Sequence, residues 1–429
     1  MRLCQVVKAG LLCSLVATAL VGVSSVARAD ITLFEKVGIS FFTSGRSAAH
    51  YQFIYGDGTP TAKVMGATLT GFRTDAYTND SNTVATSRIR SGWVGAQLNF
   101  GLIAPISPEL KTKTYFSFNV DDITNDREKT QGNGIDIREA FTQVEGSFGT
   151  VVFGRALSIF GTALAGSVYQ YSYGNGVGHP CTVDGQAITC GPVNAGAIFP
   201  GFNAQVQYVM PARNGVGMRV ALYDPSLPSL DPGLDPNNPY PYTLRPLPRV
   251  EAEVTYEMPI AGTGKLVLLG QGLWQYLGRP KSAAMMGSTS ANVLGGILAG
   301  RIEVADLRVG VGLWGGQGLG TGVPMQQGQA VDPNGELRGF KGYMAHGIYK
   351  LGDWDVGAGF GGSLVSETTF DKATPMRSLI SSNTEIHAVV YRYIGGLVLG
   401  AEFMHWISHW HGGESQQINF MGVGANYLW

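Results

Sequence analysis

Acidic and basic side chains recur at alternate positions of short apolar segments in this chain. Within Arg249–Met258, Glu251 and Glu253 alternate with apolar residues, and Arg219 lies between two apolar residues in the same way. Carboxylates and guanidinium groups that face water across a narrow opening bias which ions pass and orient polar solutes. We therefore expect Arg219, Glu251 and Glu253 to line a water-filled passage.

Common catalytic and cofactor patterns are missing from the sequence. No Gly-x-Ser-x-Gly motif stands at a strand-to-helix turn, and no P-loop or dinucleotide-binding glycine pattern follows a strand. His405 and His409 have the spacing of metal ligands on a helix, but on a strand this spacing has no special geometry. With Trp406 and Trp410 they are better explained as an interfacial aromatic belt. We expect no enzyme activity, no metal and no cofactor.

The first 29 residues have the order of parts of a secretory signal peptide. Arg2 and Lys8 are followed by the apolar run Ala9–Val23 and by the small-x-small site Ala27-Arg28-Ala29. Without this leader the chain is mildly acidic, because the formal net charge of the whole sequence is −1 and the leader contains only basic charges. This charge does not favour nucleic-acid binding.

Alternation of apolar and polar residues predicts β-strands in most of the remaining chain. A period of two gives a strand with one apolar face and one wet face. Only 14 % of the residues are charged, yet no mature segment is a continuous apolar run long enough for a spanning helix. These features predict an all-β transmembrane antiparallel barrel of about 16 strands. The predicted strands are 62–74, 88–100, 110–120, 135–145, 150–155, 203–210, 217–223, 249–258, 264–276, 291–302, 307–315, 337–350, 354–365, 384–393, 397–408 and 416–429.

The connections between these segments are alternately short and long. Outer-membrane barrels show the same alternation, with short periplasmic turns and long external loops. The barrel is therefore predicted to occupy 62–429. Residues 30–61 have two interpretations. They could form an extra hairpin that turns at Ser44-Gly45-Arg46, which would make about 18 strands, or they could be an N-terminal extension.

The chain ends in an alternating strand whose last apolar positions include Tyr427 and Trp429. An aromatic final residue on such a strand resembles the terminal signal that the barrel-assembly machinery of the outer membrane reads. We expect Tyr427 and Trp429 to serve as that signal.

Two neighbouring segments resemble the general trimeric porins of Gram-negative bacteria. Ile137-Arg138-Glu139-Ala140-Phe141 is followed, after a short turn, by a strand that ends in Gly154-Arg155. In that family a long third loop follows this strand and folds into the barrel, where its acids face basic residues on the wall. The resemblance implies a homotrimer in the outer membrane, with Arg138 and Arg155 lining the pore and 156–202 as the constriction loop.

The predicted constriction loop contains few groups that could act in the pore. Asp184 is its only acid, so the field across the pore could need the strand acids Glu251 and Glu253 as partners. Cys181 and Cys190 are an even, closely spaced pair in an exported chain, which predicts a disulfide. Such a disulfide would contribute about 2–3 kcal/mol by loop entropy.

The main functional expectation is a channel for passive diffusion of small hydrophilic solutes and ions. A second interpretation is a substrate-selective, sugar-type channel in which Tyr169, Tyr171 and Tyr173 form an aromatic track. A third is a barrel that acts as an adhesin or receptor through its external loops, which the proline-rich loop 224–248 favours.

Overall fold

The computed structural model describes most of the chain after the expected leader. The described residues are 29–33, 38–57, 83–90, 96–120, 135–168, 191–228, 242–260, 262, 264–279, 289–325, 330–373 and 379–429. The signal peptide, the strand expected at 62–74, and the loop residues Tyr169, Tyr171, Tyr173, Cys181, Asp184 and Cys190 lie outside them.

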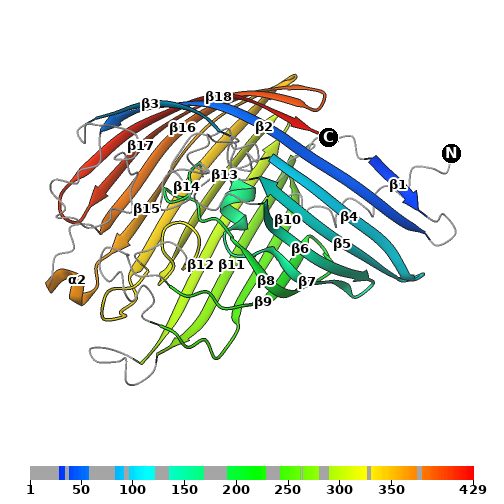
Figure 1. The fold of residues 1–429 in the computed structure, drawn as a ribbon, viewed down its shortest axis with the longest axis horizontal. Helices are drawn as coiled ribbons and strands as arrows, with labels where there is room; N and C mark the ends of the chain where they lie inside the picture. The colour runs from blue at the N-terminus through cyan, green and yellow to red at the C-terminus, as the bar shows by residue number, and fades with distance from the viewer. Residues whose placement is uncertain are drawn as a thin grey trace.

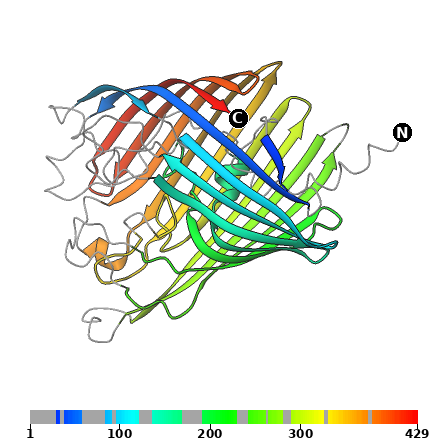
Figure 2. The same cartoon turned by 45° about the vertical axis from the view of Figure 1, so that its right-hand side comes forward.

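The described strands form one closed antiparallel barrel (Figures 1 and 2). The wall closes because β18 pairs along β2, with Val423 opposite Tyr51. β3 and β4 pair with successive parts of β2 and together occupy one wall position, and β1 pairs only with the first residues of β2, beyond the part that β18 covers. The 18 segments therefore make a barrel of 16 strands, as predicted. The strands are β1 Ala29–Leu33, β2 Ile39–Asp57, β3 Thr83–Arg90, β4 Ala96–Ser107, β5 Leu110–Val120, β6 Ile135–Gly146, β7 Gly149–Leu157, β8 Phe202–Val209, β9 Val216–Tyr223, β10 Arg249–Ile260, β11 Gly264–Gly278, β12 Ser290–Val304, β13 Leu307–Gln317, β14 Gly339–Leu351, β15 Trp354–Ser366, β16 Ile380–Ile394, β17 Leu397–Trp410 and β18 Ser415–Leu428.

The N-terminal hairpin expected at Ser44-Gly45-Arg46 is not formed, so the alternative of about 18 strands is wrong. Gly45 instead exchanges backbone hydrogen bonds with Trp429, of 2.8 and 3.1 Å. The Arg46 side chain donates to Asn426 Oδ1, with a distance of 2.7 Å from Nη2. Because the last strand satisfies these polar groups, the chain continues straight through them as β2, and only β1 folds back on its first residues.

Short turns join the strands at one end of the barrel and long connections join them at the other. The short turns between strands include 108–109, 147–148, 305–306, 352–353 and 395–396. Two short helices lie in the long connections, the π-helix η3 (Ala163–Val168) and α2 (Thr369–Ala373). Neither helix in this described part is long and apolar enough to cross a membrane.

The period-two pattern sorts side chains between the two faces of the wall, as expected. On β10, Val254 is 49 % exposed on the outer face, whereas its neighbour Glu253 is buried inside. Leu313 on β13 and Val423 on β18 are likewise exposed outside. An apolar outer surface and polar inward positions are the pattern of a barrel surrounded by lipid.

Part of the barrel interior is filled by an apolar core. Inward side chains such as Leu273, Ile297 and Met344 pack with residues of the long connection after β7, including Leu164 and Ile198. η3 lies inside the barrel against β11 to β14, as the coiled ribbon in the middle of Figure 1 shows. This packing fixes the inward-folded segment against one side of the wall.

Candidate pore constriction

Three consecutive backbone amides attach the connection between β7 and β8 to the inside of the barrel. Each amide donates to a side chain on a different strand. Ile159 N donates to Tyr223 Oη on β9, with a distance of 2.9 Å. Phe160 N donates to Glu251 Oε2 on β10 (2.8 Å), and Gly161 N donates to Gln271 Oε1 on β11 (2.9 Å). Since buried backbone N–H groups need acceptors, these side chains define where the loop lies against the wall.

A buried ion pair adds a second attachment one residue further along. Arg219 on β9 faces Glu253 on β10, and its Nε and Nη2 each lie 2.8 Å from a different carboxylate oxygen. Arg219 Nη2 also donates to Thr162 Oγ1 at 2.7 Å. Because planar two-point pairing fixes both side chains, the pair holds Thr162 at a defined point.

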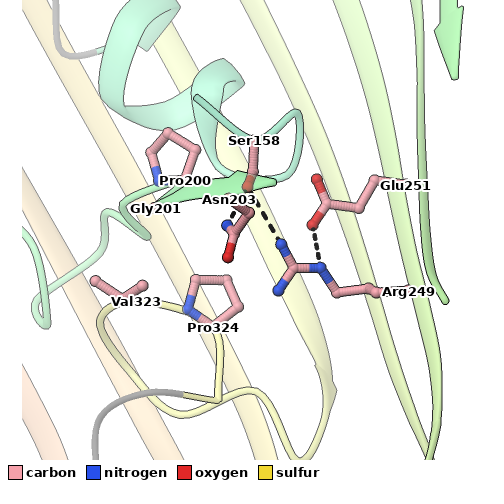
Figure 3. Close-up of a pocket in the computed structure, with 8 residues that line it drawn as sticks. All are labelled: Ser158, Pro200, Gly201, Asn203, Arg249, Glu251, Val323 and Pro324. Carbon is pink, nitrogen blue, oxygen red and sulfur yellow. Dashed lines mark hydrogen bonds and ion pairs between the residues drawn. The ribbon is translucent and has the colours of Figure 1, made fainter. Parts of the chain in front are cut away.

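The two ends of the connection meet inside the barrel, beside Arg249 of β10 (Figure 3). Ser158 N donates to Gly201 O (2.9 Å), and Arg249 Nη2 donates to Ser158 Oγ (3.2 Å). Arg249 Nε lies 3.0 Å from Glu251 Oε1, so Glu251 binds the loop and neutralises this arginine at once. The space that these residues line has no room for a solute, which makes the cluster an anchor.

The returning part of the connection is bound to the other side of the wall. Gly196 N donates to Ser363 Oγ on β15 (2.9 Å), and Trp314 Nε1 on β13 donates to Gly196 O (2.8 Å). Asn383 Nδ2 on β16 donates to Asn194 O (3.1 Å). Residues 193–198, named here the return segment, are therefore held by β13, β15 and β16.

Arg219, Glu251 and Glu253 face inward, as their alternation predicts, and the structure brings them together. Arg219 and Glu253 pair with each other, and Glu251 pairs with Arg249. In the described part of the chain they contact the loop, one another and the inward side chains of Arg249 and Gln271. These residues therefore bind the inward-folded loop, and their role in lining a water-filled passage stays a prediction.

Arg155 lies on a different face from the one expected. It stands opposite Ala140 of β6 and Ala204 of β8, and it shares its face with Phe153, which is 45 % exposed. The inward positions of β7 are those of residues such as buried Val152. The alternation therefore points Arg155 away from the lumen, because the resemblance indicated a position along the chain but not a face of the strand.

Arg138 is displaced by a β-bulge. The register shifts between Ile137, opposite Phe118, and Glu139, opposite Ser117, so Arg138 is the extra residue. Its guanidinium carbon lies 5.9 Å from the centroid of the Phe202 ring, and Phe202 lies on the same outward face of β8 as exposed Ala204. A bulge adds one residue to a strand, so the position along the chain that the resemblance indicated does not fix the face on which Arg138 lies.

The tryptophans near the last external loop also differ from expectation. Trp406 and Trp410 are 1 % and 2 % exposed on the inner face of β17, so they do not form an interfacial belt. Trp406 Nε1 donates to Ser408 Oγ inside the barrel (2.9 Å). A pattern of aromatic residues alone does not distinguish a filled lumen from a lipid interface, because both accept large rings.

Several loop-binding side chains were not found from the sequence. They are neutral residues at inward strand positions, and nothing in their spacing distinguishes them from other polar residues that face water. The residues are Tyr223, Gln271, Trp314, Ser363 and Asn383.

The inner wall across β2, β4, β5 and β6 has a different chemistry. Asn99, Ser117 and Asn119 face inward there, and Lys113 Nζ lies 5.5 Å from the centroid of the Phe42 ring. Polar amides and hydroxyls hydrogen-bond water and polar solutes. This side of the lumen is therefore lined by buried polar groups, in contrast to the apolar core side.

The chain matches one protein family and resembles several solved outer-membrane channels. A family model described as Gram-negative porin matches residues 16–429. The fold is similar to the outer membrane channel DcaP of Acinetobacter baumannii, with 16 % identity, 91 % of this chain and 97 % of that chain covered, and a TM-score of 0.65. It is also similar to an anion-selective porin from Comamonas acidovorans, with 10 % identity, 91 % and 100 % coverage, and a TM-score of 0.59. The trimer form of OmpT from Vibrio cholerae has 13 % identity, 91 % and 99 % coverage, and a TM-score of 0.50. No curated protein sequence matches the chain.

Proposed function

The chain belongs to the Gram-negative porin family and forms a channel in the outer membrane, and from this premise we propose that it passes small hydrophilic solutes and ions by passive diffusion. The inward-folded connection after β7 sets the size limit. Solutes pass between this connection and the hydrophilic wall of β2 to β6.

The attachment of residues 158–162 to three adjacent strands carries this proposal. A loop that only covered the mouth would not need three consecutive amides bound to Tyr223, Glu251 and Gln271 inside the barrel. A fixed loop gives a constant pore width, whereas a loose loop would open and close the passage. We also propose that Cys181 and Cys190 form a disulfide in the remainder of this loop.

The charged residues that anchor the loop to β9 and β10 should contribute little to the ion preference of the channel. Arg219 is paired with Glu253 and Arg249 with Glu251, so the two carboxylates cancel the two guanidinium charges. Any strong preference would have to come from other groups, among which we include Asp184. The sign of the reversal potential under a salt gradient shows whether all the charges along the pore together favour cations or anions.

We further propose that the protein works as a homotrimer. A relative in trimer form and the resemblance at 137–155 support this assembly. Chemical cross-linking in detergent, with mass determination by light scattering, would give a particle of three chains. A monomer that still conducts would refute the trimer while leaving the channel intact.

The size limit is tested by comparing two variants on the same strand. Glu253→Gln removes the charge that binds Arg219, whereas Glu257→Gln removes an inward charge that pairs with Lys265 far from the loop. We expect Glu253→Gln to admit larger neutral sugars in a liposome-swelling assay, and Glu257→Gln to keep the wild-type limit. No conductance from folded, inserted wild-type protein would refute the diffusion pore and favour a receptor barrel. Saturable block by one sugar would favour a selective channel.

A further inference from the structure

An open groove crosses the outer surface of the barrel on β10 to β13, which run side by side in the wall (Figure 1). Its volume is about 570 Å³, and two neighbouring rows of outward side chains line it. The row nearer the short turns is Tyr256, Leu268, Gly300 and Val311, which are direct partners across the four strands. The second row is Val254, Gly270, Leu298 and Leu313.

Glycines make the hollow, and leucines border it. Each row contains one glycine, and a Cβ on Gly300 would lie 3.3 Å from Leu268 Cδ2. A Cβ on Gly270 would lie 3.8 Å from Leu298 Cδ2. Leu298 is 71 % exposed and therefore stands above the floor that the glycines leave open.

The groove lies in the half of the membrane next to the short turns. The first row is four residues from the short-turn end of every strand, since these ends are Ile260, Gly264, Val304 and Leu307. Four residues cover about 13 Å along a strand, and a tilt of about 40° reduces this to roughly 10 Å of height. Half of the hydrocarbon core is about 15 Å thick. Short turns are periplasmic in outer-membrane barrels, so the groove faces the periplasmic leaflet.

One end of the groove opens at the level of the lipid head groups. Tyr256 stands opposite Val216, the first residue of β9, and a Cβ on Gly215 in the preceding turn would lie 3.5 Å from Tyr256 Cε2. Other exposed aromatic residues lie near the short turns, as in the girdle that marks a membrane interface. They are Tyr208, Tyr349, Trp354 and Tyr427.

The chemistry of the groove requires an apolar occupant. In the part of the chain that the structure describes, the rows on both sides of it contain no polar side chain. These rows are Met258, Leu266, Ile302 and Val309 toward the short turns, and Ala252, Gly272, Gly296 and Gly315 on the other side.

The size of the groove fits a single hydrocarbon chain. Two rows span about 7 Å along the strands and four strands span about 14 Å across them, a footprint of about 100 Å². A stable protein interface buries about 800 Å² on each partner, so a second barrel would not be held by this feature. An empty groove would also lose the van der Waals contacts that its walls can make.

We propose that this groove is a binding site for one acyl chain of a periplasmic-leaflet phospholipid, whose head group lies beside Tyr256. The walls contact the chain from both sides, which a flat part of the barrel surface does not do. The site is on the opposite face of the wall from the lumen, so it is separate from the diffusion pathway.

Native mass spectrometry of the full-length protein tests the site. Delipidated protein in mild detergent is mixed with dipalmitoyl phosphatidylethanolamine, and the wild type should retain one phospholipid for each chain. The double variant Gly270→Leu with Gly300→Leu fills the floor and should lose this lipid. Both new side chains point outward and approach only the flexible ends of leucines, so the barrel should still fold.

Gly347→Leu is the matched control. Gly347 lies on the outer face of β14, also four residues from the short-turn end at Leu351, and does not line the groove. The nearest atom to a Cβ there is Val309 Cγ2, at 3.8 Å. This variant should retain the lipid as the wild type does. Heat-modifiable migration on gels confirms that each variant is folded.

Three results would overturn the site. They are a wild-type protein that retains no phospholipid, a double variant that retains as much as the control, and a double variant that loses its oligomeric state but keeps the lipid. The last result would show that a second copy of the chain covers the groove. None of them bears on conductance, because the pore lies on the other face of the wall.

Discussion

The binding of the return segment depends on Gly196, and Gly196→Ala should displace it. The φ angle of Gly196 is +109°, a conformation that costs a residue with a side chain about 1–3 kcal/mol. An alanine Cβ would also lie 2.5 Å from Tyr343 O, 2.8 Å from Gly361 Cα and 2.9 Å from Gly362 N. These are backbone atoms of β14 and β15, which cannot rotate away.

The expected penalty follows from these two terms together. Forced contacts in a packed interior cost about 1–3 kcal/mol, so the substitution should disfavour the bound position by about 2–6 kcal/mol. At 1.4 kcal/mol for each factor of ten, this lowers the ratio of bound to released return segment by about 30-fold or more. The barrel strands keep their own hydrogen bonds, so the variant should still fold and insert.

Single-channel recording and liposome swelling measure the effect at neutral pH. Gly196→Ala should give noisier openings and admit larger sugars than the wild-type channel. Gly413→Ala is the matched control, because Gly413 also has a positive φ of +90° but has nothing within 4 Å of an added Cβ. A Gly196→Ala channel with wild-type noise and the wild-type size limit would show that the return segment does not constrain the pore.

Two further substitutions and one measurement on the unchanged protein have distinct expected results. Burial alone would raise the pKa of Asp371, but hydrogen bonds and the charge of Arg338 hold it below its ordinary value, so Asp371 stabilises the external loops at neutral pH and loses this effect as the pH falls through its lowered pKa. Asp371→Asn should cost about 3–5 kcal/mol of local stability, seen as faster protease cleavage of these loops at pH 7, and unchanged cleavage would contradict the role of the pair. Thiol titration of unfolded protein without reductant should find no free thiol from Cys181 and Cys190 if they form the predicted disulfide, and two free thiols would exclude it. Trp429→Ala should lower the yield of folded protein in the outer membrane, measured by heat-modifiable migration, while a wild-type yield would remove Trp429 from the assembly signal.

Strand positions could be predicted because a barrel wall imposes a period of two on every strand. Segments such as Arg249–Met258 and Leu307–Trp314 alternate clearly, and they are β10 and most of β13 in the structure. The count of 16 was right, and it includes Ile39–Asp57, in the segment that the sequence left open between an extra hairpin and an extension. The polar triplet Ser44-Gly45-Arg46 has the composition of a turn, and its pairing with the last strand on one side and with β4 on the other keeps it extended.

Which side chains of a regular strand face inward could also be predicted. This prediction failed where the strand pairing is irregular or where it rested on resemblance alone. Arg219, Glu251 and Glu253 face the lumen because their strands continue without a bulge. Arg138 lies at a bulge, and a bulge leaves no reliable mark in a single sequence. Both Arg138 and Arg155 were assigned by likeness to a family motif, which does not say which way a side chain points.

The sequence by itself determined an exported, alternating β-chain with short and long connections, and hence the class of the protein. This follows because lipid outside and water inside act on every residue of every strand, so the signal accumulates along the chain. Only the tertiary structure decided which side chains hold the constriction loop, where an apolar core fills the lumen, and where four strands enclose a groove on the outer wall. These contacts join strands that are far apart in the sequence, and their geometry depends on barrel closure and register.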